Sequence, residues 1–70
     1  MRHVKVEAFH DGEMWCAKGV KDSIFTQGRT YDELIENVKE AVALHFEEEI
    51  KAGEKVDVLM MSELEIVNVA

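Results

Sequence analysis

The sequence predicts one α+β domain with the element order β-β-β-α-β, in which a small mixed sheet carries one helix on one face. Three observations predict this class. Apolar and polar residues alternate on both sides of Asp11-Gly12, a third short segment is rich in β-branched and aromatic residues, and residues 30–50 have apolar positions three and four apart. The 70 residues are the length of a single domain, 1–70.

The first two strands are predicted near residues 2–10 and 13–19. Asp11-Gly12 is typical of a two-residue type I′ turn, because both positions must adopt positive φ angles. In the register set by this turn, His10 pairs with Glu13 and Phe9 with Met14. One face then holds the expected core residues Val4, Val6, Ala8, Trp15 and Ala17.

The opposite face of this hairpin is mostly polar, but it carries Phe9 and Met14 side by side. This apolar pair is either a small satellite contact or part of a surface for a subunit or partner.

A third strand is predicted over residues 24–26, and Thr26-Gln27-Gly28 is expected to form a tight exit in which Gly28 takes a positive φ angle. The alternative is that the backbone groups of this tripeptide line a partner surface. Thr30 and Glu33 are typical of a capping box, in which each side chain accepts a hydrogen bond from the backbone amide of the other residue.

The helix is expected to extend from Thr30 to about residue 50 and to stop at Gly53. A last strand is predicted around Leu64, Ile66 and Val69, and residues 57–62 either join it or form a bend. One helix covers one face of such a sheet, so the other face is left open for self-association or for a partner.

The charge balance favours a basic partner. Eight Lys and Arg against fifteen Asp and Glu give a net charge of −7, which repels nucleic acid and anionic membranes, although it also serves solubility. Cys16 is the only cysteine and no apolar run approaches the length of a membrane helix. We expect a cytoplasmic protein with no direct nucleic acid or membrane binding.

No residue pattern indicates catalysis, a cofactor or a metal site. Cys16 lies on a strand with no evident base nearby, and the three histidines lack the short spacing of metal ligands. We expect a protein that is not an enzyme.

Three motifs resemble the HicB family of antitoxins: a hairpin with an Asp-Gly turn and a Trp-x-Ala, then Thr-Gln-Gly-x-Thr, then Glu-Asn-x-x-Glu-Ala in the helix. The residues that carry this resemblance are Asp11, Gly12, Trp15, Ala17, Thr26, Gln27, Gly28, Thr30, Glu36, Asn37, Glu40 and Ala41. It covers residues 2–52. It implies a partial RNase H-like fold without catalytic carboxylates, and an antitoxin that masks a small basic ribonuclease of the HicA type.

This chain departs from the family in two respects. A C-terminal DNA-binding domain, which many members carry, is not expected, and the proline-rich loop that commonly precedes Thr-Gln-Gly is replaced by residues 19–25 without proline. The alternative to an antitoxin is an orphan HicB-like module that acts as a self-associating or ligand-binding domain. A homo-oligomer, a dimer or tetramer, is expected in either case, and the candidate partner-binding residues are Phe9, Met14, Glu36, Glu40 and Glu47.

Overall fold

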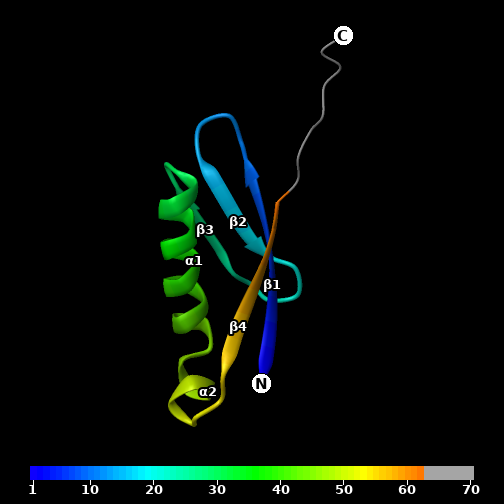
Figure 1. Ribbon diagram of the computed structural model, residues 1–70, viewed down its shortest axis with the longest axis vertical. Helices are drawn as coiled ribbons and strands as arrows, with labels where there is room; N and C mark the ends of the chain where they lie inside the picture. Colours follow the sequence, from blue (N-terminus) through cyan, green and yellow to red (C-terminus); the bar gives the residue numbers. More distant parts are fainter. Residues whose placement is uncertain (63–70) are drawn as a thin grey trace.

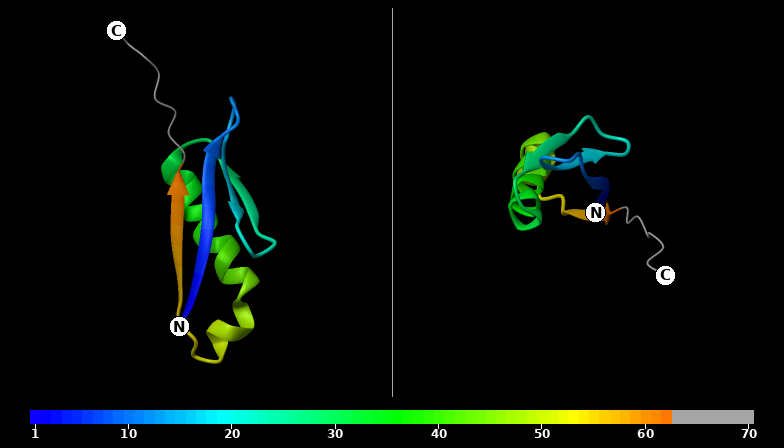
Figure 2. Two further views of the ribbon diagram at one scale, coloured as in Figure 1. Left: turned by 90° about the vertical axis from the view of Figure 1, so that its right-hand side faces the viewer. Right: turned by 90° about the horizontal axis from the view of Figure 1, so that it is seen from above.

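The computed structural model describes residues 1–62. The elements are β1 (Arg2–His10), β2 (Trp15–Gly19), β3 (Phe25–Gly28), α1 (Tyr31–His45), α2 (Glu47–Lys51) and β4 (Val56–Ser62). The strands form one mixed sheet in the order β3-β2-β1-β4, where β1 pairs antiparallel with β2 and parallel with β4, and β2 pairs antiparallel with β3. Helix α1 packs on one face of this sheet (Figures 1 and 2). The predicted α+β class and element order are confirmed.

The first hairpin has the predicted strands but a wider turn than predicted. Its loop spans Asp11–Met14, and one carboxylate oxygen of Asp11 accepts hydrogen bonds from the amides of Glu13 at 2.9 Å and Met14 at 2.8 Å. The prediction of a two-residue turn is wrong, because the Asp11 carboxylate holds Glu13 and Met14 in the loop as well. The register moves by two as a result, so His10 pairs with Trp15 and Phe9 with Cys16, and Phe9 does not pair with Met14.

A displacement of two residues keeps every side chain on its predicted face. The core confirms this, since the sheet residues predicted to face it are buried or partly buried there. The core consists of Val4, Val6, Ala8, Ala17, Ile24, Leu34, Val38, Val42 and Phe46, with Trp15, Tyr31, Ala41, Val56, Val58 and Met60 packed against it.

Gly28 is the last residue of β3 and not part of a tight exit. The predicted positive φ angle is wrong, because Gly12 and Gly53 alone have positive φ angles among the described residues. Gly28 is required for clearance instead: a Cβ atom there would lie 2.6 Å from the amide nitrogen and 2.9 Å from the Cα of Leu34. The strand end therefore touches the first turn of α1 directly.

Half of the predicted capping box is present. The Thr30 hydroxyl accepts a hydrogen bond from the Glu33 amide at 3.1 Å, which confirms Thr30 as the N-cap of α1. The Glu33 carboxylate accepts from the amide of Arg29 at 3.3 Å and not from that of Thr30. The reciprocal bond is thus displaced by one residue.

The predicted single helix is interrupted at Phe46, whose backbone has φ −108° and ψ 29°. Its ring is buried in the core, and the guanidinium carbon of Arg2 lies 5.0 Å from the ring centroid. Helix α2 then ends at Lys51 with Ala52 as its C-cap, and Gly53 follows with φ 91° and donates its amide to the carbonyl of Ile50. The predicted stop at Gly53 is confirmed.

Strand β4 occupies the segment that the sequence left open between a strand and a bend. Val58 pairs with Val4 and Met60 with Val6, so alternate residues of β4 face the core. The predicted strand around Leu64, Ile66 and Val69 lies outside the described residues.

Candidate functional site

The five candidate partner-binding residues lie on two opposite sides of the molecule and do not form one site. Glu36, Glu40 and Glu47 are exposed on the helices, whereas Phe9 is half-buried on the sheet face that α1 does not cover. Met14 is half-buried in the hairpin loop. The structure therefore offers two separate surfaces.

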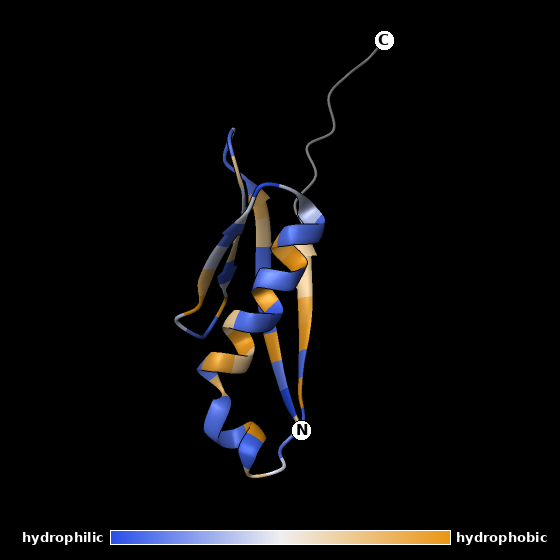
Figure 3. Cartoon of the chain, turned by 90° about the vertical axis from the view of Figure 1, so that its left-hand side faces the viewer, coloured by the Kyte–Doolittle hydropathy of each residue, from blue (hydrophilic) through white to orange (hydrophobic). Residues whose placement is uncertain are grey.

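The first surface, which we call the acidic helical surface, consists of exposed carboxylates on α1 and α2. Its members are Asp32, Glu33, Glu36, Glu40, Glu47 and Glu48. Because Leu34, Val38 and Val42 are buried, the carboxylates of α1 lie at the helical positions that face outward. Figure 3 views this side and shows hydrophilic residues along both helices.

Two of the three candidate glutamates are already paired. Glu36 lies 3.5 Å from the Lys39 ammonium and Glu47 lies 2.9 Å from that of Lys51. Such exposed pairs contribute little stability, so a partner with a higher positive charge can replace the lysines at small cost. Within residues 1–62, Glu40 makes no ion pair.

Sequence reasoning missed the apolar residue of the acidic helical surface. Leu44 is 73% exposed and lies four residues after Glu40, so the two side chains share a helix face. The signal was available, because Leu44 falls outside the spacing of the buried residues.

The second surface, which we call the open sheet face, lies opposite α1. Its members alternate with the core residues along the four strands: His3, Lys5, Glu7, Phe9, Cys16, Lys18, Phe25, Gln27, Asp57, Leu59 and Met61. Phe25 is 59% exposed, Leu59 is 55% exposed and Met61 is 38% exposed. Phe25 lies in the predicted third strand, which the structure places at residues 25–28 and not 24–26, but its face was not assigned from sequence. Leu59 and Met61 were missed because the sequence left residues 57–62 open between a strand and a bend.

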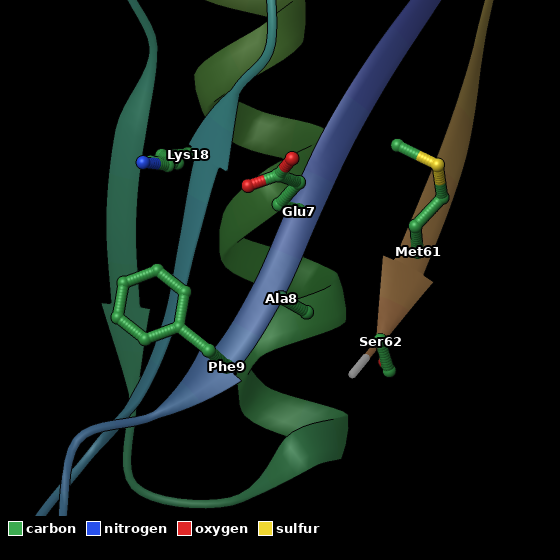
Figure 4. Close-up of a pocket in the computed structure, with 6 residues that line it drawn as sticks. All are labelled: Glu7, Ala8, Phe9, Lys18, Met61 and Ser62. Carbon is green, nitrogen blue, oxygen red and sulfur yellow. The ribbon is translucent and has the colours of Figure 1, made fainter. Parts of the chain in front are cut away.

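A shallow depression of about 530 Å³ lies on this face between β1 and β4 (Figure 4). Glu7, Phe9, Lys18 and Met61 line it. Phe9 on β1 and Met61 on β4 give it apolar walls, and Glu7 on β1 and Lys18 on β2 give it charged ones.

Cys16 is buried although it belongs to the open sheet face. Burial and the nearby Asp11 carboxylate, 3.7 Å from the thiol, raise the pKa of Cys16. A thiol with a raised pKa stays protonated near neutral pH and is a poor nucleophile. Within residues 1–62 no three His, Cys, Asp or Glu side chains gather as metal ligands.

The Thr-Gln-Gly backbone is used inside the molecule. The carbonyl oxygen of Gln27 accepts a hydrogen bond from the side-chain amide of Asn37 at 2.6 Å, which ties β3 to α1. Gln27 and Asn37 therefore have a structural role here.

A comparison with curated proteins found a partial relative. The chain is 62% identical over 34 residues to a UPF0150 protein of Thermotoga maritima, and the match covers 49% of each chain. The chain thus spans about half the length of the curated relative it matches. No family model and no solved structure matches the chain.

The name of the relative states neither a reaction nor a partner. No helix among residues 1–62 has the length and apolar character needed to cross a membrane.

Proposed function

We propose that this chain is an antitoxin-like protein, not an enzyme, which binds and masks a small basic HicA-type mRNA ribonuclease in the cytoplasm. Charge separation carries the proposal. Residues 31–54 hold eight carboxylates and two lysines, whereas residues 1–30 hold four carboxylates and five Lys or Arg. The acidic helical surface is therefore the part of the described chain that best complements a basic protein.

Masking follows from the chemistry of RNA binding. A ribonuclease must present positive charge to the RNA backbone, because phosphate contacts dominate the affinity. Carboxylates held on a rigid helix compete for the same positive side chains, and the helix excludes the RNA sterically. Leu44 adds an apolar contact among these charges.

Two kinds of similarity support the family part of the proposal. The identity to a UPF0150 protein relates about half of this chain to another protein. The resemblance to HicB antitoxins rests on motifs of the hairpin, β3 and α1, and it supplies the toxin as the partner.

The direct test is co-purification of this chain with the small basic protein encoded beside it, followed by RNA cleavage with and without this chain. We expect a stable complex and loss of cleavage. If the two proteins do not associate, or if cleavage continues in the complex, the proposal is wrong.

The acidic contact is tested by changing Glu36, Glu40 and Glu47 together to Gln. We expect weaker toxin binding, by about ten-fold or more, and a smaller dependence of the affinity on salt. The matched control compares the pair Glu36→Gln and Glu40→Gln with the pair Glu13→Gln and Asp22→Asn, which alters the net charge equally but away from the helices. Leu44→Ala should weaken binding while leaving the salt dependence unchanged.

A second candidate function is an orphan module that self-associates or binds a ligand without a toxin. The open sheet face favours it, because Phe25 and Leu59 are large, apolar and more than half exposed there. If no gene for a small basic protein lies beside the gene for this chain, that observation supports this candidate over the first.

A further inference from the structure

One row of side chains crosses all four strands of the open sheet face. The register pairs Phe25 with Lys18, Lys18 with Glu7 and Glu7 with Met61. From β3 to β4 the row is therefore apolar, basic, acidic and apolar. Figure 4 shows Lys18, Glu7 and Met61 following one another across β2, β1 and β4, with α1 behind the sheet.

This row is complementary to itself when its direction is reversed. A two-fold axis parallel to the strands, placed between two facing sheets, lays β3 of one copy over β4 of the other. Phe25 then faces Met61 of the second copy, and Lys18 faces Glu7 of the second copy. Each apolar end meets an apolar end and each charge meets its opposite.

The adjacent row supports the same arrangement. Phe9 pairs with Cys16 and Cys16 with Gln27. The same axis places Phe9 over Cys16 of the second copy, so the exposed part of Phe9 is covered on each side. Sheets that pack face to face lie about 10 Å apart, a distance that Lys and Glu side chains span together.

The charge of the open sheet face also favours a second copy of this chain as its binding partner. On the open sheet face Lys5 and Lys18 balance Glu7 and Asp57, so two such faces do not repel. Two acidic helical surfaces would repel each other, and a strongly basic partner gains more from the acidic helical surface than from this balanced one.

We propose that the open sheet face binds a second copy of this chain in a two-fold, face-to-face dimer. Both acidic helical surfaces remain on the outside of this dimer, so the proposal does not depend on the toxin. The face covers roughly 400 Å² from strand spacing and rise, below the roughly 800 Å² per partner of a standard interface. The dimer is therefore expected to form reversibly and to depend on protein concentration.

The first measurement is sedimentation velocity of the intact chain over a wide concentration range. We expect the sedimentation coefficient to rise from the monomer value to the dimer value. Glu7→Lys and Lys18→Glu should each weaken this association at least ten-fold, because each places two like charges opposite each other in both halves of the interface. A wild-type chain that stays monomeric throughout overturns the proposal.

Mixing the two variants is the decisive experiment. Glu7 and Lys18 are also neighbours within one sheet, so a single charge reversal could act inside the monomer. In a mixture, two lysines of the Glu7→Lys chain face two glutamates of the Lys18→Glu chain. We expect a heterodimer from two variants that are each monomeric alone. If no heterodimer forms, the proposed two-fold pairing of Glu7 with Lys18 is wrong.

Two further variants keep the test interpretable. Lys39→Glu makes the same charge change on α1 and should leave self-association unchanged. Phe25→Ser removes an exposed apolar end of the row without touching the core, and circular dichroism should show an intact fold. Undiminished association of Phe25→Ser would contradict the proposed interface, as would an effect of Lys39→Glu equal to that of Lys18→Glu.

Discussion

Asp11 organises the tip of the first hairpin through its ionised carboxylate. Hydrogen bonds from the backbone amides of Met14 and Glu13 hold the pKa of Asp11 below its ordinary value, and the Cys16 thiol adds a weaker bond. The same carboxylate makes the loop four residues long. A sequence rule for Asp-Gly turns considers the backbone angles of these two residues but not this side chain.

Protonation of the Asp11 carboxylate at low pH is expected to lower the stability of the fold. Because its pKa is lower in the folded chain than in the unfolded chain, its stabilisation is complete above the ordinary value of 3.8 and is lost as the pH falls through the folded pKa. We expect Asp11→Asn, which keeps an acceptor oxygen, to reduce the loss of stability in this acidic range. Urea unfolding at several pH values measures it.

The control for this prediction is Glu13→Gln in the same loop. Within residues 1–62 the Glu13 carboxylate makes no hydrogen bond or ion pair, so this variant should follow the wild-type pH profile. Identical acid profiles for Asp11→Asn and the wild type would contradict the role given to Asp11.

At the scale of elements, sequence patterns predicted the strands and the helix better than their junctions. The faces of β1 and β2 were predictable because alternation survives a shift of two residues. The helix interruption at Phe46 was not, since the ring turns into the core and contacts Arg2 from the other end of the chain. Local spacing carries no information about such a tertiary contact.

The junction of β3 and α1 depends on the absence of a side chain at Gly28. We expect Gly28→Ala to destabilise the fold by about 1–3 kcal/mol, because the new methyl group would overlap backbone atoms of Leu34 that cannot move aside as a side chain can. Thermal unfolding measures the effect. For a domain of this size, 1 kcal/mol corresponds to roughly 4–8 °C in melting temperature.

Ser23→Ala is a suitable control, since Ser23 is exposed in the loop before β3. Its melting temperature should stay close to that of the wild type. If Gly28→Ala melts at the wild-type temperature, the close approach of β3 to α1 is not what requires glycine.

At the scale of the whole molecule, charge and hydrophobicity are distributed between two opposite faces. The net charge and the existence of an open face were predictable from composition and element count. The row from Phe25 to Met61 was not, because it requires the registers of three strand pairs at once. The same holds for the candidate site. The three glutamates were predicted on the helix, whereas the exposed apolar residues were missed: Leu44, Phe25, Leu59 and Met61.

The concentration of carboxylates in residues 31–54 should make the fold more stable as salt rises. Like charges on neighbouring helical positions repel, and the few exposed ion pairs contribute less than this repulsion removes. We expect the melting temperature to rise by roughly 5 °C between low and physiological sodium chloride, which screens charges over about 8 Å.

This measurement is best made at low protein concentration, where self-association does not add stability. Glu40→Gln removes a carboxylate that makes no ion pair within residues 1–62 and should show a smaller response to salt. A melting temperature that falls as sodium chloride rises would mean that attractive pairs outweigh repulsion in this chain.

The parallel pairing of β1 with β4 has a consequence for synthesis on the ribosome. Arg2 pairs with Val56 and Ala8 with Ser62. Because β4 follows β1 in the sequence, β1 is synthesised without this partner strand until nearly all of residues 1–62 have been made. Meanwhile its hydrogen-bonding edge is uncovered, and such an edge pairs readily with other chains. The time from synthesis of β1 to synthesis of β4 is therefore the period in which this protein is most prone to aggregate.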